Sequence, residues 1–285
     1  MKPTAKSLIL DLLQSLRGRA LPVRALVEAG ALFGLRENAV RVALARLLER
    51  GTVEREQAGQ YRLPAERQAL SRHIARWSER EGRTVAWTGA WVGVLGAGLA
   101  RSERSARRRD ARALALLGFA ELAPSLWVRP DNLRGGVAAT RAELHELGLA
   151  REAAVVGLSE LEAELDARAR ELFDGEARTR SLRAARVSVE RGLARLPELA
   201  RESAMVESFR VGGRAIRELV LDPCLPDALA PESERRALLA AMRAYDRAGR
   251  AAWREFLRSH DAFSANLPVS SAGLSANHPA LASVA

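Results

Sequence analysis

The chain has 285 residues, a mass of 31.0 kDa and a formal net charge of +10 at pH 7. It has no run of eighteen apolar residues, which argues against a membrane span, and its single cysteine, Cys224, excludes an intramolecular disulfide and a thiolate metal site. The basic charge favours a polyanionic partner, but all lysine and arginine positions except Lys2 and Lys6 are arginine, so position is more informative than number.

The N-terminal part of the chain is predicted to form three helices. Apolar side chains recur at three- and four-residue spacing in residues 4–16 and in residues 37–50, which is typical of amphipathic helices. Between these segments, Pro22 suits the start of a helix, and Gly34 suits its end in a left-handed conformation. The apolar stripe of the third helix is expected to pack on the two earlier helices and consists of Val40, Ala43, Leu44, Leu47 and Leu48.

A β-hairpin is expected directly after the third helix. Gly51 ends that helix, and residues 52–57 and 60–63 flank an Ala58-Gly59 turn. Three helices followed by such a hairpin form a winged helix-turn-helix, so residues 1–64 are predicted to be a DNA-binding domain. The residues expected to face DNA come from the outward side of the third helix and from the hairpin: Arg36, Asn38, Arg41, Val42, Ala45, Arg46, Arg55, Gln57, Gln60 and Arg62.

The residue types on this surface suit contacts with DNA. Asn38 lies near the start of the helix and can reach base edges in a major groove, whereas Arg41 and Arg46 can bind phosphates or a guanine. The small outward side chains Val42 and Ala45 allow close approach. The alternative is a helical hairpin with a solvated basic face, because most charged helix faces contact only water, but that alternative leaves the β-hairpin unexplained.

The middle of the chain is expected to form a small domain of strands and helices. Residues 65–84 are predicted to be a connecting helix, and the apolar run Val85–Leu95 then predicts a buried strand. A helix, a hairpin around Pro124-Ser125, a second helix and a strand up to Leu158 are expected to follow. This order is the split βαβ arrangement of a ferredoxin-like domain, predicted for residues 85–158.

The rest of the chain is predicted to be helical up to residue 263. Four segments show helical apolar spacing: Glu160–Phe173, Ala177–Leu196, Leu199–Gly212 and Glu232–His260. Three prolines predict a rigid extended connection over Arg214–Pro231. Residues 159–263 are expected to serve dimerisation and ligand response, with the apolar helix faces as the dimer surface, and residues 264–285 are expected to be a disordered tail. The predicted fold class is α+β.

An enzymatic function is not expected. The four histidines, His73, His145, His260 and His278, have no metal-ligand spacing, so no metal site is predicted. The middle domain resembles the ferredoxin-like nuclease associated with CRISPR systems, which uses an aspartate at the end of its first strand. Val85–Leu95 contains no carboxylate, which makes metal-dependent cleavage an unfavoured alternative.

Five stretches of the sequence carry a resemblance to a known family: Ser7–Leu13, Phe33–Gly51 (FGLRENAVRVALARLLERG), Trp87–Trp91 (WTGAW), Leu114–Pro130 and Leu219–Pro231. Together they resemble the PaaX family of bacterial transcriptional repressors, which control phenylacetic acid degradation. The resemblance places Asn38 and Arg41 in the recognition helix, and Gly59 and Tyr61 in the wing. The sequence departs from the family at Arg36, where a small capping residue is common, and at residues 232–235, where the family usually has a tryptophan-containing turn.

The resemblance implies a homodimer that binds operator DNA and is released by an aryl-acetyl-CoA thioester. We therefore expect a cytoplasmic repressor that binds double-stranded operator DNA as an inverted repeat, with no cofactor and with phenylacetyl-CoA or a related aryl-CoA as inducer. The basic runs Arg101–Arg112 and Arg178–Arg191 suit the phosphates of coenzyme A, and Trp87, Trp91 and Trp127 are candidates to hold the aryl group. Aromatic strand residues are more often part of a core. The alternative function is a nucleic-acid-associated accessory protein without a small-molecule ligand.

Overall fold

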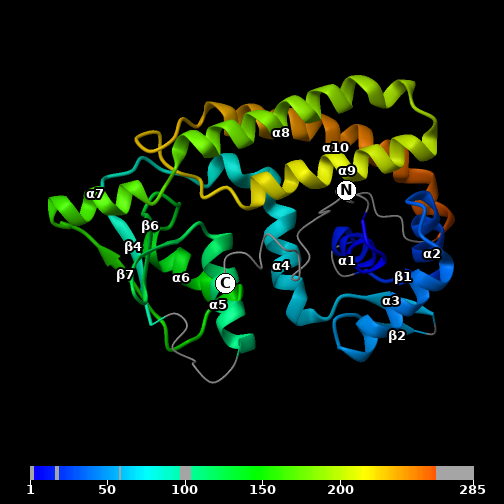
Figure 1. The fold of residues 1–285 in the computed structure, drawn as a ribbon, viewed down its shortest axis with the longest axis horizontal. Coiled ribbons are helices and arrows are strands. Elements are labelled where there is room, and N and C mark those ends of the chain that lie inside the picture. Colours follow the sequence, from blue (N-terminus) through cyan, green and yellow to red (C-terminus); the bar gives the residue numbers. More distant parts are fainter. Residues whose placement is uncertain (1–2, 17–18, 58, 97–103, 261–285) are drawn as a thin grey trace. The chain divides into compact units, whose positions relative to one another are not determined.

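A computed structural model describes residues 3–16, 19–57, 59–96 and 104–260 of the chain (Figure 1). The structure contains helices together with two small antiparallel sheets, which confirms the α+β class. The described residues divide into two compact units. Unit 1 draws on residues 3–78, 185–217 and 238–260, and unit 2 draws on residues 79–184 and 218–237.

Unit 1 begins with the three helices and the hairpin that the sequence predicts. The helices are α1 (Ala5–Ser15), α2 (Val23–Leu32) and α3 (Glu37–Glu49), and the strands are β1 (Leu21–Pro22), β2 (Glu54–Gln57) and β3 (Gln60–Arg62). The two-residue strand β1 has no signal in the sequence pattern; it pairs with β3 in a sheet of order β1-β3-β2. The connecting helix divides into α4 (Ala65–Ala75) and a 3-10 helix, η1 (Arg76–Gly82).

Local sequence signals explain the ends of these helices. Thr4 caps α1, because its hydroxyl accepts a hydrogen bond from the Ser7 amide while the Ser7 hydroxyl accepts one from the Thr4 amide. Gly34 after α2 and Gly51 after α3 have φ angles of 71° and 59°, which glycine adopts without a Cβ clash. The turn that precedes α3 is therefore set by Gly34, as the sequence predicts.

The hydrophobic core of unit 1 combines residues that are far apart in the sequence. Besides residues of α1, α2, α3 and the hairpin, it contains Met205, Phe209 and Trp253. The Phe33 and Phe209 rings meet edge to face at 5.1 Å between centroids, and the Trp253 indole N–H donates to the Met205 carbonyl at 3.1 Å. The core that includes the predicted domain of residues 1–64 is thus completed by residues more than 140 positions later in the chain.

Unit 2 is built around a four-stranded sheet. Its strands are β4 (Trp91–Leu95), β5 (Ala120–Ala123), β6 (Leu126–Pro130) and β7 (Ala154–Leu158), and its sheet-associated helices are α5 (Arg104–Leu116) and α6 (Gly136–Glu146). The sheet order is β5-β6-β4-β7, and each neighbouring pair is antiparallel. The elements follow one another in the predicted order of strand, helix, hairpin, helix and strand.

The strand predicted for Val85–Leu95 is shorter in the structure, because β4 begins only at Trp91. Val85 and Ala86 are exposed, and Gly89 has a φ angle of 93°, far from the range of a β-strand. The Trp87 indole N–H donates to the Ala90 carbonyl at 2.6 Å, a contact within the segment itself. The apolar run alone therefore predicted the wrong start for this strand.

Four further helices follow in the described chain: α7 (Ala163–Glu171), α8 (Gly175–Arg195), α9 (Arg201–Val220) and α10 (Ser233–Ser259). A 3-10 helix, η2 (Leu196–Glu198), lies between α8 and α9. Helices α8, α9 and α10 each contribute residues to both units. The residues predicted to form one helical domain, 159–263, are thus divided between the units. The predicted tail, residues 264–285, lies outside the described residues.

The extended connection predicted for Arg214–Pro231 is helical in its first part, because α9 continues to Val220. Ala215, Ile216 and Leu219 keep helical apolar spacing and are buried, which favours continuation of the helix. The helix ends before Pro223, a residue that disfavours helical geometry in the residue preceding it. The prediction was wrong for residues 214–220 because it gave the prolines more weight than the apolar spacing.

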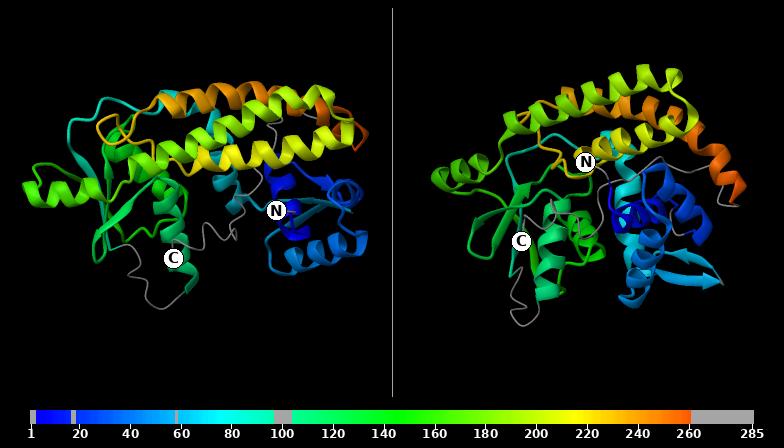
Figure 2. Two further views of the ribbon diagram at one scale, coloured as in Figure 1. Left: turned by 45° about the horizontal axis from the view of Figure 1, so that its top comes forward. Right: turned by 45° about the vertical axis from the view of Figure 1, so that its right-hand side comes forward.

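Within unit 1, helices α8, α9 and α10 run alongside one another (Figure 2). Gly192 of α8 faces the Tyr245 ring, where an added Cβ would lie 2.9 Å away, and Gly212 of α9 faces Met242. The large hydrophobic side chains exposed among the described residues are Val42, Val85, Leu95 and Leu172. The apolar helix faces expected to form a dimer surface are therefore largely used within the chain itself.

Candidate nucleic-acid interface

Helix α3 presents a row of short side chains to solvent. Its apolar stripe is buried as predicted, with Val40 and Leu44 at most 3% exposed. On the opposite side Asn38, Val42 and Ala45 are exposed at spacings of four and three residues, which aligns them along the helix. Such a row lets the helix backbone approach another surface closely.

Arg41 and Arg46 flank this row, and both are exposed. The Nε atom of Arg41 lies 2.7 Å from the carboxylate of Glu37, one turn earlier, in a solvent-exposed ion pair. No ion pair joins Arg46 to another residue that the structure describes. Arg36 is the N-cap residue of α3, is exposed and makes no capping hydrogen bond through its side chain. Arg46 and Arg36 are therefore available to an anionic partner, whereas Arg41 must first leave Glu37.

Both arginines predicted for the hairpin are engaged within it. Arg62 lies 2.7 Å from Glu54 and 2.9 Å from Glu56. The guanidinium of Arg55 lies over the Tyr61 ring, 5.6 Å from its centroid, and donates to the Tyr61 hydroxyl at 3.3 Å. The hairpin is thus close to electrically neutral.

Two glutamines form the end of the hairpin. Gln57 and Gln60 are paired across β2 and β3, and their amide groups can donate and accept hydrogen bonds without a charge. The ion pairs of Arg62 with Glu54 and Glu56 were not predicted from the sequence. A signal for them exists, because alternation along a strand places Glu54 and Glu56 on one face.

Of the three tryptophans expected to form a ligand site, Trp91 and Trp127 lie on opposite faces of the unit 2 sheet, and Trp87 precedes strand β4. Trp91 is in register with Pro130, and Trp127 is in register with Val94. Because side chains alternate along a strand, Trp91 points to one face while Val94 and Trp127 point to the other. Trp87 meets Trp91 edge to face at 5.2 Å. The structure therefore brings Trp87 and Trp91 together, but not Trp127.

Trp91 is fully buried in an aromatic cluster of unit 2. Its ring stacks on Phe173 at 6.0 Å, and its indole N–H donates to Asp166 at 2.8 Å. The guanidinium of Arg170 covers the Trp87 ring at 4.7 Å. Burial raises the pKa of Asp166, but hydrogen bonds from Arg170 and Trp91 outweigh it and leave the pKa below its usual value. These side chains satisfy one another, as core residues do.

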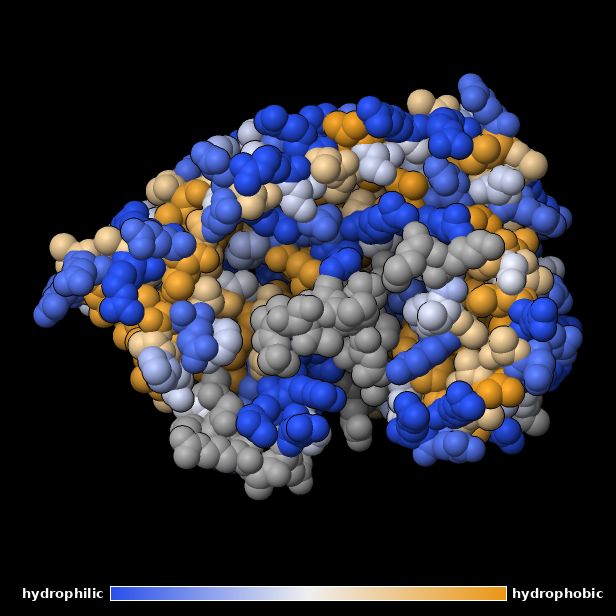
Figure 3. Space-filling view, viewed as in Figure 1, coloured by the Kyte–Doolittle hydropathy of each residue, from blue (hydrophilic) through white to orange (hydrophobic). Residues whose placement is uncertain are grey.

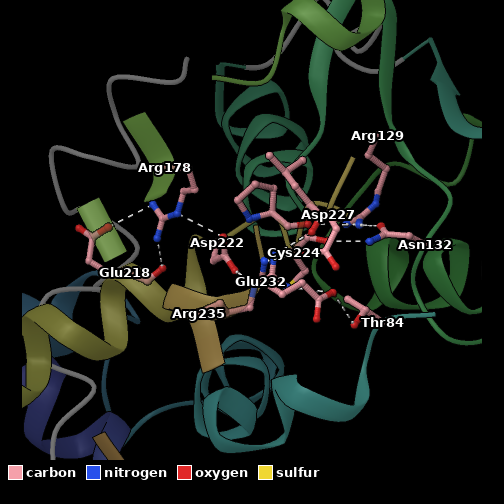
Figure 4. Close-up of polar contacts among 12 residues, drawn as sticks. Thr84, Arg129, Asn132, Arg178, Glu218, Asp222, Cys224, Asp227, Glu232 and Arg235 are labelled. Carbon is pink, nitrogen blue, oxygen red and sulfur yellow. Dashed lines mark hydrogen bonds and ion pairs between the residues drawn. The ribbon is translucent and has the colours of Figure 1, made fainter. Parts of the chain in front are cut away.

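A buried ionic network holds the segment between α9 and α10 (Figure 4). The carboxylate of Asp222 lies 2.5 Å from Arg235 and 3.2 Å from Arg178, and the Asp222 side chain is 1% exposed. Arg235 also donates to the Leu225 carbonyl at 2.9 Å. Burial lowers the pKa of Arg235, but the charge and hydrogen bond of Asp222, together with the electrostatic effects of Cys224 and Glu232, outweigh it and raise the pKa, so the guanidinium stays charged.

The same segment is bonded to the sheet of unit 2. Arg129 of β6 is buried and donates to the Pro223 carbonyl at 3.2 Å and to the Asn132 side chain at 3.0 Å. Asn132 in turn donates to the Cys224 carbonyl at 2.8 Å. Gly118 lies so close to Pro223 that an added Cβ would meet the Pro223 Cβ at 2.4 Å. The proline-rich segment is thus fixed on unit 2 by contacts that its own sequence does not reveal.

The basic run Arg178–Arg191 is largely paired with carboxylates. Its ion pairs join Arg178 to Glu218 and Asp222, Arg180 to Glu176, Arg183 to Glu234, and Arg186 to Glu190. These arginines neutralise acidic neighbours, so the run is a weaker phosphate-binding candidate than its sequence suggests. In the other run, Arg101–Arg112, residues 101–103 lie outside the described residues.

Neither histidines nor acidic residues form a metal site in the described part of the chain. No group of three or more His, Cys, Asp or Glu side chains there is arranged to hold an ion. His145 contacts the Leu149 carbonyl, and His260 lies 2.9 Å from Glu28. Among the described helices, none is long and apolar enough to cross a membrane.

Comparisons with known proteins link the first part of the chain to one family. Residues 4–72 match the model of a family described as PaaX-like protein. No curated protein matches the chain. A similar solved structure is the uncharacterized protein Rv0674 from Mycobacterium tuberculosis, with 24% identity over 81% of this chain and 91% of that chain and a TM-score of 0.44.

Proposed function

We propose that this PaaX family protein is a transcriptional repressor that binds double-stranded operator DNA through α3 and the β2–β3 hairpin, as a winged helix-turn-helix. The observation that carries this function is the exposed row of Asn38, Val42 and Ala45 on a helix whose opposite side is buried. A helix of this kind fits the major groove, where an asparagine can bond an adenine and small apolar side chains can contact thymine methyl groups.

The ion pairs of α3 predict which of its arginines contributes more to the affinity for DNA. Arg46→Ala is expected to weaken binding and to lower the salt slope of log affinity by about 0.9, the value for one lost phosphate contact. Arg41→Ala should have a smaller effect, since Arg41 must leave Glu37 to reach DNA, and Glu37→Gln should strengthen binding. Fluorescence anisotropy at several salt concentrations measures these changes.

Arg180→Ala is the matched control for this series. Arg180 is exposed and forms an ion pair with Glu176 at a spacing of four residues, as Arg41 does with Glu37. Its replacement removes the same charge from a helix that is not proposed to bind DNA. An equal loss of affinity for Arg180→Ala and Arg46→Ala would show that only net charge matters and would remove α3 as the reading helix.

A single recognition helix reads a short half-site, so the proposed repressor binds as a homodimer to an inverted repeat. The half-sites of such a repeat lie about 34–36 Å apart, or a multiple of that distance. The apolar faces of α8, α9 and α10 are largely buried within the chain, and we therefore place the proposed dimer surface on other residues.

We also propose that an aryl-CoA thioester such as phenylacetyl-CoA releases the protein from DNA, which is what the family resemblance implies. Linkage requires operator DNA to weaken ligand binding by the same factor as ligand weakens DNA binding, about 5–150-fold. Calorimetric titration of phenylacetyl-CoA with and without operator DNA measures that factor. Absence of heat in both titrations would favour a DNA-associated accessory protein without a ligand, in line with the internally paired arginines and tryptophans.

A further inference from the structure

The proposed DNA-reading surface carries little net charge. On the hairpin, Arg55 and Arg62 are balanced by Glu54 and Glu56. On α3, Glu37 and Glu49 are exposed beside the arginines. Because neutralisation of phosphates supplies a large share of affinity for DNA, a reading surface of this kind gains from cations elsewhere on the protein.

Helix α5 of unit 2 has an exposed basic surface, formed by Arg104, Arg107, Arg108 and Arg109. At 100° per residue, Arg104, Arg107 and Arg108 fall within a sector of about 100° on the helix surface. No ion pair joins any of the four to another residue that the structure describes. Strongly hydrophilic side chains gather over this helix in Figure 3. This surface contrasts with α8, most of whose arginines are paired with carboxylates.

The rest of α5 is firmly held, which gives the surface a fixed place on unit 2. Ala113, Leu114 and Leu116 are buried at no more than 1% exposure. Asp110, the acidic residue of α5, is also buried, and its carboxylate accepts a hydrogen bond from the Ala150 amide at 2.9 Å. The negative charge of the helix is thus turned inward, and its positive charges face solvent.

We propose that the α5 basic surface binds backbone phosphates of duplex DNA, an inference that rests on the proposed function. Charge complementarity with a polyanion selects this occupant, because four exposed guanidinium groups without a carboxylate partner in the described structure suit backbone phosphates. The contact is independent of sequence, so α5 contributes affinity and salt dependence, while α3 contributes base preference.

The test uses the full-length protein and a duplex selected by the wild-type protein from random DNA. The variant Arg104→Gln, Arg107→Gln, Arg108→Gln is expected to lower the salt slope by about 2–3, since each lost phosphate contact contributes about 0.9. The preferred DNA sequence should stay unchanged. The control variant Arg180→Gln, Arg183→Gln, Arg195→Gln removes three exposed arginines of α8 and should leave the slope nearly unaltered.

The outcomes separate the two proposals. If the wild-type protein selects no DNA sequence, the proposed function fails. If it selects one and the α5 variant keeps the wild-type salt slope, the α5 inference is overturned while the proposed function stands. Equal slopes for the α5 and α8 variants would likewise overturn it, by attributing the change to net charge. Single replacements of Arg104 and Arg108, each expected to lower the slope by about 0.9, repeat the test with smaller changes.

Discussion

Replacement of Asp222 by alanine is expected to lower the free energy of unfolding by about 3–5 kcal/mol, because breaking a buried ion pair leaves its partner charged and unsolvated. The partner most affected is Arg235, whose side chain is 5% exposed and 2.5 Å from Asp222. Arg178 loses a contact as well, at 3.2 Å. Chemical denaturation followed by circular dichroism measures the change.

The control for this prediction is Glu176→Ala, which breaks an exposed ion pair with Arg180. An exposed pair of this kind contributes about 1 kcal/mol or less. Similar losses for the two variants would contradict the buried network as the main anchor of the segment between α9 and α10.

Replacement of Trp253 by alanine is expected to destabilise unit 1 by about 3–5 kcal/mol, the usual cost of deleting a buried aromatic side chain. Trp253 packs against Phe209 at 6.1 Å and belongs to the same core as α1, α2 and α3. DNA binding should therefore weaken together with thermal stability, although Trp253 lies outside the proposed reading surface. The neighbouring exposed residue offers the control, since Arg254→Ala should change stability by no more than about 0.5 kcal/mol.

A fragment of residues 1–78 tests the same core more severely. It lacks Met205, Phe209 and Trp253, so apolar side chains such as Phe33 lose their partners. We expect a fragment that unfolds without a cooperative transition and binds DNA poorly. A cooperatively folded fragment with full DNA affinity would show that α9 and α10 are dispensable for the reading domain.

Much of the fold could be predicted because its signals are local. Apolar spacing, Gly34 and Gly51 were sufficient to predict α1, α2, α3 and the hairpin, and turn residues were sufficient to predict β5 and β6. Strand β1 could not be predicted, since two residues paired with distant ones carry no periodicity. The start of β4 was predicted too early, because the apolar run continues through residues whose backbone is not extended. The end of α9 was predicted too early, because the prolines were given more weight than the packing of the helix.

The candidate site likewise has features that could be predicted from the sequence and features that could not. Exposure of Asn38, Val42, Ala45 and Arg46 follows from the helical period and is confirmed by the structure. The partners of side chains could not be predicted when they come from other elements, as for Arg129 and the segment that it binds. The position of Trp127 depended on strand register, which fixes the sheet face and is not encoded in residue type.

Selection of preferred duplexes from random DNA, by the wild-type protein and by Asn38→Ala, tests most directly whether α3 reads operator sequence. An asparagine that bonds a base edge contributes about 1–3 kcal/mol of discrimination at one base pair. We therefore expect the wild-type protein to select an inverted repeat, and Asn38→Ala to lose its preference at one position of each half-site while keeping the others. Identical preferences for both proteins would contradict base reading by Asn38, and selection of no sequence by the wild-type protein would contradict the repressor function itself.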